Sequence, residues 1–387
     1  MTRRAAAPNR DRSFGTVFDP ARNSLNFLRL ALALAVLASH SIPLGGFGDE
    51  NLLVHTTIGT VAVFGFFAIS GYLIAASAQR TSVPRFLWQR CLRIFPAFWV
   101  CLIVTAGVIA VIAWLGHGSF LRPHCGAECY GLGRGGAVDY VVHNFLLRMN
   151  QHRIAGTPWN VPYPYTWDGS LWTLFYEFVC YLLLGLLALV GLLRRRTVVT
   201  VLAVAVWCAA AVVAFGWAAP VLNADLQRLA YLVPPFLAGT LLFLYRDRVP
   251  DSAWLAVGFG AAYVATLWLP LGGWFISGPM LFAPLLAYPV LWLGVHLPFQ
   301  RVGARNDYSY GIYVYAFPVQ QLLVVFGLAR WGYLPFTFIA VGLTVPLAVA
   351  SWWAVERNAL KLKRARLRVP PVTARGPAPA VTEAAEP

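Results

Sequence analysis

The sequence is poor in charged residues. Asp, Glu, Lys and Arg make up 12% of its 387 residues and apolar residues make up 59%, whereas soluble domains contain roughly 25% charged residues. A water-soluble globule of this size needs more polar side chains to cover its surface. The composition therefore excludes a soluble enzyme, a disordered chain and a disulfide-rich secreted domain, and it predicts a polytopic helical membrane protein.

Acidic residues are especially scarce. The chain has 15 Asp and Glu against 30 Lys and Arg, a formal net charge of +15, and only two of the basic residues are lysines. A charge of this size suits nucleic-acid binding when it forms one basic patch, but here the arginines are spread between apolar runs. That distribution indicates membrane topology, and we expect no nucleic-acid partner.

A cleavable signal peptide is not evident either. Residues 1–22 are polar and carry five arginines, and the first apolar run ends without the small-residue motif that a signal peptidase cleaves. We therefore expect this run to remain as a permanent membrane span.

The six cysteines are scattered, and four of them lie in or beside apolar runs, as packing residues do. Cys125 and Cys129 lie instead in a long polar segment. They could form a small-loop disulfide, stay as free thiols, or bind zinc together with His117 and His124. The sequence leaves these alternatives open, and we assign no metal site.

Long windows without a charged residue divide the chain into membrane spans. A helix of about 20 residues crosses the hydrocarbon core. The longest window, residues 252–300, is long enough for two spans joined by a turn at 269–273 that contains Pro and Gly. We predict an all-α protein with ten spans, near residues 25–42, 52–78, 95–116, 171–192, 198–216, 227–245, 253–269, 275–294, 308–328 and 334–354.

The positive-inside rule supports ten spans. With the N-terminus in the cytoplasm, 23 of the 30 basic residues lie inside and six lie outside, and nine or eleven spans would lose this asymmetry. We therefore predict a multi-pass protein of the bacterial inner membrane with both termini in the cytoplasm. Its parts are a cytoplasmic segment (1–22), a ten-span domain (23–356) with a long outer loop (117–170), and a basic, then disordered, tail (357–387).

Two ionisable residues share the first span. Arg29 and His40 are 11 residues apart, which at 100° per residue is about 20° from three full turns, so both side chains lie on one helix face about 16 Å apart. Arg29 is expected near the inner end and His40 near the outer end. Ionisable residues within a membrane are costly and are typical of functional sites. Alternatively, Arg29 extends to the lipid headgroups and His40 caps the helix.

Glu177 lies about two turns into the fourth span, at the expected depth of His40. An acid there could share a hydrogen bond with the imidazole, orient the ring and raise its basicity. The alternative is a structural glutamate that pairs with an arginine or with the backbone.

Arg85, Arg90 and Arg93 precede the third span on its inner side. Arg90 and Arg93 are one helical turn apart, so they can bind phosphates together with the arginine of the first span. The alternative is an anchoring role at the membrane surface. In the second span, Ser70 and Gly71 form a small-residue notch that another helix can approach closely.

Five sequence elements follow one another along the chain: Arg29 and His40 with ten residues between them, FFAISGYLI at 66–74, RCLRIFP at 90–96, WTLFYE at 172–177 and YSYGIYVY at 308–315. In this order they resemble the membrane-bound acyltransferase-3 family, over about residues 20–360. At one position the chain departs from the family, which often has a histidine two residues before the proline that follows the last element, where this chain has Ala316.

The resemblance implies an enzyme that transfers an acyl group, usually acetyl, from cytoplasmic acyl-CoA. The implied acceptor is a hydroxyl of an exported or cell-surface polysaccharide or of a lipid-linked oligosaccharide, and no permanently bound cofactor is expected. His40 would act as general base or as transient acyl carrier. The implied catalytic residues are His40, Glu177 and Arg29, and the implied donor-binding residues are Arg85, Arg90, Arg93, Ser70 and Tyr313.

Other functions remain open at this stage. The same fold could transfer succinyl or another acyl group, and Ala316 is compatible with an inactive scaffold of a polysaccharide export system. A secondary transporter also has ten to twelve spans, but it usually shows two halves with matching broken helices. Here the ionisable residues are concentrated in the first four spans.

Overall fold

The computed structural model describes residues 12–50, 55–116, 134–215, 223–268 and 277–364. Within these ranges the chain is helical apart from loops, with two isolated β-bridges and no strand. The expected turn at 269–273 lies outside the described residues, and so do Cys125, Cys129 and the two histidines beside them.

Nine of the ten expected spans coincide with a helix or a continuous helical segment, and the eighth, near 275–294, is divided among three short consecutive helices. The described part of the chain is thus all-α, with the apolar helices of a multi-pass membrane protein. Three of these helices are shorter than 18 residues: α10 (Ala253–Thr266), α12 (Ala287–His296) and α13 (Ser309–Val325). The count of ten and the placement of both termini inside stay predictions. In the described part of the chain, seven helical segments are long and apolar enough to cross a membrane: α2 (Leu25–Gly45), α3 (Ile58–Arg80), the segment Val83–Gly116, α7 (Trp172–Leu189), α8 (Arg196–Ala214), α9 (Ala224–Leu244) and the segment Tyr333–Lys361.

Two of the long segments contain a π-helical turn. The first consists of α4 (Val83–Val104), η1 (Thr105–Ile109) and α5 (Ala110–Gly116), and the second of α14 (Tyr333–Ser351), η7 (Trp352–Glu356) and α15 (Arg357–Lys361). Short helices occupy the connections: α1 (Phe14–Val17), α6 (Ala137–Asn144), η4 (Leu192–Arg194), α11 (Gly278–Leu281), η5 (Ala283–Leu286), η6 (Leu328–Trp331) and η8 (Leu362–Arg364).

Helix α4 begins 12 residues before the predicted start of the third span at residue 95. Ser82 is extended and Pro84 lies in the first turn, where a missing N–H costs nothing because that group has no partner within the helix. The arginines that precede the span are therefore carried on the helix itself, with Arg90 and Arg93 one turn apart as predicted.

The small-residue notch predicted in the second span is confirmed, because the backbones of α3 and α9 touch there. A Cβ atom on Gly71 would lie 1.9 Å from the carbonyl oxygen of Phe236, and one on Gly239 would lie 2.0 Å from that of Ala68. Thr240 Oγ1 also donates a hydrogen bond to the Gly71 carbonyl (3.2 Å). Any side chain at either glycine would push the two helices apart.

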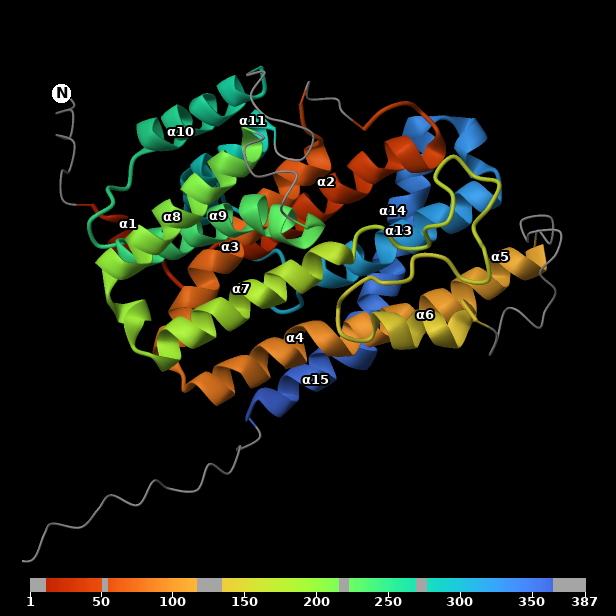
Figure 1. Ribbon diagram of the computed structural model, residues 1–387, viewed down its shortest axis with the longest axis horizontal. Helices are drawn as coiled ribbons and strands as arrows, with labels where there is room; N and C mark the ends of the chain where they lie inside the picture. Colours follow the sequence, from red (N-terminus) through yellow and green to blue (C-terminus); the bar gives the residue numbers. More distant parts are fainter. Residues whose placement is uncertain (1–11, 51–54, 117–133, 216–222, 269–276, 365–387) are drawn as a thin grey trace, which may run out of the picture.

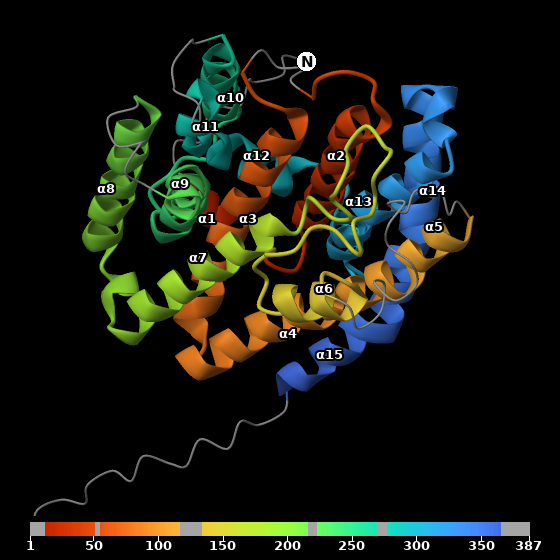
Figure 2. The same ribbon diagram turned by 45° about the vertical axis from the view of Figure 1, so that its right-hand side comes forward.

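Helix α3 occupies the middle of the molecule. Figure 2 shows α8, α9, α3, α2, α13 and α14 following one another across the view, and each neighbouring pair is in contact. Helices α4 and α15 lie together along the lower edge, with α7 above them (Figure 1). The candidate site lies where α2, α3, α7 and α13 meet.

Candidate active site

Two cavities adjoin at the junction of α2, α3, α7 and α13. The first, the His40 cavity, has a volume of about 140 Å³ and is lined by His40 and Glu50 among others. The second, the Arg29 cavity, has a volume of about 40 Å³ and is lined by Arg29 and Glu177 among others. Three residues line both cavities and form the wall between them: Val63, Thr173 and Tyr313.

Arg29 and His40 lie on one face of α2, as their spacing predicted, because they line adjoining cavities. The His40 ring meets Phe317 edge to face, with 5.4 Å between ring centroids. His40 Nδ1 is buried and has no hydrogen-bond partner among the described residues. Helix α2 continues to Gly45, so His40 does not cap it.

Glu177 faces the Arg29 cavity and not His40. Its Oε1 atom accepts hydrogen bonds from Ser70 Oγ (2.9 Å) and Tyr181 Oη (2.5 Å). The hydrogen bond between Glu177 and His40 that equal depth suggested is therefore not made within the described residues. Depth fixes one coordinate only, and the wall stands between the two side chains.

Arg29 and Arg93 both bind one carboxylate. Asp307 Oδ2 lies 2.6 Å from Arg29 Nη1 and 2.5 Å from Arg93 Nη2, and Asp307 Oδ1 accepts a hydrogen bond from Ser309 Oγ (2.5 Å). Burial alone would raise the pKa of Asp307, but the two guanidinium groups hold it well below its usual range. Arg29 is thus paired within the protein, so it does not extend to the headgroups.

A second acid completes this ion cluster, which consists of Arg29, Arg93, Asp307 and Glu356. Arg93 Nη1 lies 3.3 Å from Glu356 Oε2, and Glu356 is only 2% exposed. Glu356 is the last residue of the π-helical turn η7. Local π-helical turns often occur at functional sites, and this one ends at the acid that contacts Arg93.

Arg90 has no acidic partner in the described part of the chain. Its Nε atom is buried without a hydrogen bond, and its guanidinium lies 5.9 Å from the ring centre of Phe86. Lys363, on η8, is close enough to feel the charges of Arg90 and Arg93. Burial, followed by these two charges, lowers the pKa of Lys363 to about 8. Arg85 is exposed at the start of α4 and lies apart from this group.

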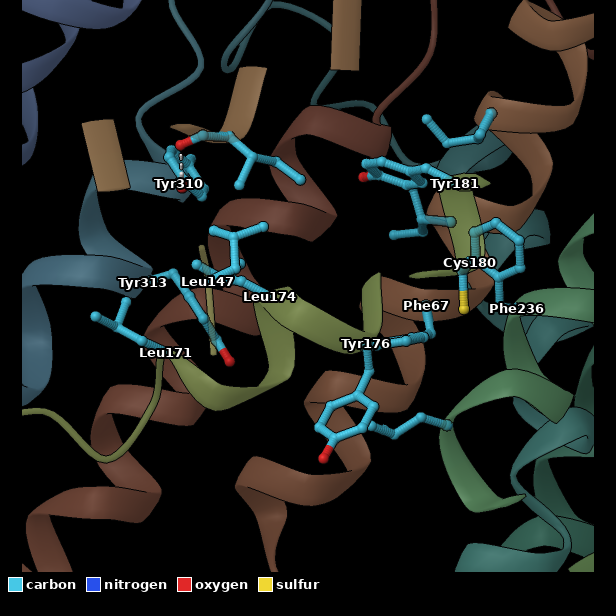
Figure 3. Close-up of a cluster of buried hydrophobic side chains, with 14 of the residues drawn as sticks. Phe67, Leu147, Leu171, Leu174, Tyr176, Cys180, Tyr181, Phe236, Tyr310 and Tyr313 are labelled. Atoms are coloured by element: carbon cyan, nitrogen blue, oxygen red, sulfur yellow. Dashed lines mark hydrogen bonds between the residues drawn. The ribbon is translucent and has the colours of Figure 1, made fainter. Parts of the chain in front are cut away.

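The two remaining predicted residues, Ser70 and Tyr313, lie on helix faces that point into the bundle. Ser70 binds Glu177, as described above. Tyr313 Oη donates to the carbonyl oxygen of Ser170 (2.9 Å) and is hydrogen-bonded to the Thr173 hydroxyl, which fixes it in the wall. Figure 3 shows Tyr310 and Tyr313 on α13, Leu174 on α7 and Tyr181 farther along α7. Tyr310 Oη donates a hydrogen bond to the backbone oxygen of Ile94 (2.7 Å).

The structure therefore brings Arg29, Ser70 and Glu177 together and places Arg90 and Arg93 beside them. His40 lies across the wall. Sequence analysis missed three acids: Glu50, Asp307 and Glu356. Asp307 directly precedes one of the recognised sequence elements, which could have drawn attention to it, whereas Glu50 and Glu356 lie outside every element.

This arrangement combines three chemical functions. A buried imidazole with an unpaired nitrogen can accept a proton. A guanidinium that forms no ion pair with an acid among the described residues can bind a phosphate. A wall one side chain thick separates the two, so a small group that passes the wall can be exchanged between molecules held on either side.

Comparison with known proteins supports an acyl-transfer activity. A family model described as an acyltransferase domain matches residues 22–353. An "O-acetyl transferase" of Shigella phage Sf6 is 28% identical over 351 residues, which cover 87% of this chain and 96% of that protein. No solved structure matches the chain significantly.

Two rhizobial proteins are similar over most of their length. The "Exopolysaccharide production protein ExoZ" of Rhizobium meliloti (strain 1021) is 29% identical over 328 residues, covering 81% of this chain and 93% of that protein. The "Nodulation protein 10" of Rhizobium leguminosarum bv. viciae is 28% identical over 387 residues, covering 88% of this chain and 94% of that protein.

Proposed function

This chain belongs to the acyltransferase-3 family, and on that premise we propose that it is an O-acetyltransferase of polysaccharide. The donor is acetyl-CoA bound from the cytoplasm, and the acceptor is a hydroxyl of an exported, cell-surface or lipid-linked glycan. The names of two similar proteins, an O-acetyl transferase and an exopolysaccharide production protein, favour this substrate class. The observation that carries the proposal is the pair of adjoining cavities with His40 in one and the arginines beside the other.

The proposed topology has ten spans with both termini inside, in the inner membrane of a bacterium. The distribution of basic residues supports it, since 23 of the 30 lie on the inner side in this arrangement, among them Arg90, Arg93 and Lys363. The Arg29 cavity then faces the cytoplasm, where acyl-CoA is found, and the His40 cavity faces the outside.

Arg90 is the proposed principal phosphate ligand of the donor. The guanidinium groups of Arg29 and Arg93 are paired with the carboxylates of Asp307 and Glu356. The positive charge of these two arginines is therefore largely neutralised within the ion cluster. Arg90 keeps its full charge, and Lys363 adds to it when protonated. Arg29 and Arg93 then shape the site, and Arg85 acts as an anchor at the membrane surface.

In the proposed reaction the thioester carbonyl reaches the wall from the side of the Arg29 cavity. His40 takes the proton from the acceptor hydroxyl, the hydroxyl oxygen attacks the carbonyl carbon, and the C–S bond breaks. The proton then passes from the imidazolium to the CoA thiolate, which restores neutral His40. Transfer through an acylated His40 uses the same groups in two steps.

Surface polysaccharide from cells that express each variant tests this proposal. His40→Ala is expected to lower ester-linked acetate by at least about 100-fold at matched protein levels, because general-base catalysis contributes about 10²–10⁴. His143→Ala is the matched control, because His143 is exposed on α6, away from both cavities. Wild-type acetylation in the His40→Ala strain would overturn the assignment.

A further inference from the structure

Glu50 shares the cavity of His40, although it comes from the segment after α2 and not from a membrane-spanning helix. We propose that Glu50 is the positioning residue of His40, an acid that orients the imidazole and stabilises the imidazolium formed during transfer. This inference rests on the proposed function and adds the counter-charge that the reaction needs. It assigns to Glu50 the part that sequence reasoning gave to Glu177.

Glu50 is held in place by a short chain of hydrogen bonds. Ser39 Oγ donates to Glu50 Oε1 (2.6 Å) and accepts from the backbone N–H of Gly59 (2.9 Å). Ser39 is 2% exposed and directly precedes His40 in the sequence. The N-terminal end of α3 therefore fixes Ser39, and Ser39 fixes the carboxylate in the cavity that His40 also lines.

Close packing at Gly59 supports this arrangement. A Cβ atom there would lie 3.1 Å from Ser39 Oγ and 3.3 Å from Glu50 Oε1, which is closer than side chains normally approach. Glycine thus lets the carboxylate approach the helix end, where the positive end of the helix dipole favours a negative charge.

The other charged groups near the site are already engaged. Glu177 lies across the wall and is bonded to Ser70 and Tyr181, and Arg29 is bonded to Asp307. Glu50 is the one acid among the described residues that line the His40 cavity. A buried imidazolium without a counter-charge is costly, so this carboxylate is the group that can lower that cost.

The proposal takes Nε2 as the basic nitrogen of His40, since Nδ1 is buried without a hydrogen-bond partner among the described residues. Glu50 then acts on the imidazolium through its charge in the cavity that both residues line. Nε2 takes the hydroxyl proton while the oxygen forms its bond to the carbonyl carbon and the C–S bond breaks. The thiolate then receives that proton, and the Glu50 carboxylate stays ionised throughout.

Glu50→Gln tests the charge without changing the shape. The amide oxygen can still accept the hydrogen bond from Ser39, so folding should be unaffected. We expect kcat to fall at least about tenfold, with the KM values for acetyl-CoA and acceptor unchanged, and Glu50→Asp to recover part of the loss. The assay measures transfer of labelled acetyl from acetyl-CoA to deacetylated host polysaccharide by membrane vesicles. Asp49→Asn is the matched control, because Asp49 is the exposed acid next in the chain.

Chemical rescue supplies a readout that a merely structural role would not move. Added imidazole should restore part of the activity of His40→Ala, and rescue of the double variant His40→Ala/Glu50→Gln should be weaker by the factor that Glu50→Gln costs alone. Wild-type kcat in Glu50→Gln, with His40→Ala inactive, would overturn the role of Glu50 only. A raised acceptor KM with unchanged kcat would also overturn it, since Glu50 would then bind the acceptor. Wild-type activity of His40→Ala would overturn the proposed function itself.

Discussion

Replacing Arg93 with alanine separates the structural arginines of the ion cluster from the arginine that is free to bind substrate. Arg93 is the one cation in contact with Glu356 among the described residues, and it shares Asp307 with Arg29. Its removal leaves Glu356, which is 2% exposed, without a counter-charge. Breaking a buried ion pair in this way costs about 3–5 kcal/mol.

We expect Arg93→Ala to lower the free energy of unfolding by about 3 kcal/mol, the lower end of that range, because Arg29 still binds Asp307. Arg90→Ala should cost about 1 kcal/mol or less, since Arg90 forms no ion pair among the described residues and its ring contact is with Phe86. The effects of the two substitutions on the KM for acetyl-CoA should have the opposite order, with the larger effect in Arg90→Ala. Arg90→Ala should raise the KM for acetyl-CoA by roughly 10- to 100-fold, the value of one charge-assisted hydrogen bond to phosphate.

Reversible unfolding in mixed micelles titrated with SDS measures the first quantity, and initial rates at varied acetyl-CoA measure the second. The double variant Arg93→Ala/Glu356→Gln serves as the internal check, because neutralising the stranded acid should recover part of the lost stability. Equal destabilisation by Arg90→Ala and Arg93→Ala would refute the division of roles, and so would an unchanged KM in Arg90→Ala.

Three further predictions concern the fold. Reporter fusions after residue 196 should report the cytoplasm and fusions at residue 136 the outside; the opposite result at either position would contradict the ten-span topology. Gly71→Ala should cost at least about 2 kcal/mol of unfolding free energy, because its Cβ atom would meet a carbonyl oxygen at 1.9 Å, whereas Gly107→Ala, facing open space, should cost little. Burial raises the pKa of Asp168, in the loop before α7, to about 7; the folded protein therefore binds this proton more tightly than the unfolded chain, and stability should fall as the pH rises from about 4 to about 7. Thermal unfolding across that range should show a smaller fall in Asp168→Asn, and identical pH profiles would rule this out.

Much of the helical layout can be predicted from the sequence because it follows from hydropathy along the chain. Nine of the ten expected spans coincide with a helix or a continuous helical segment, and Gly71 marks a true contact between helices, since a small residue is required wherever backbones touch. The helical phase of Arg29 and His40 is also predictable, because it depends only on residues within one helix.

The contacts that each side chain makes with other helices could not be predicted from the sequence. Glu177 and His40 were expected to meet because they lie at similar depth, but which helices stand side by side depends on packing across the whole bundle. The same limit hides the partners of Arg29 and Arg93, since Asp307 and Glu356 are more than 200 residues away from them in the sequence. Of the four arginines expected to bind phosphate together, Arg29 and Arg93 are therefore neutralised by acids from distant segments that the sequence pattern did not indicate.

The wall of Val63, Thr173 and Tyr313 determines which part of the donor has to cross the membrane. Because these three residues line both cavities, the proposed reaction does not require the nucleotide part of the donor or the glycan to change compartments. In that reaction only the acetyl group, two carbons in length, passes from one side to the other. On the proposed topology the reaction is vectorial: the energy of a thioester made in the cytoplasm is used to build an ester outside, and no coenzyme is exported.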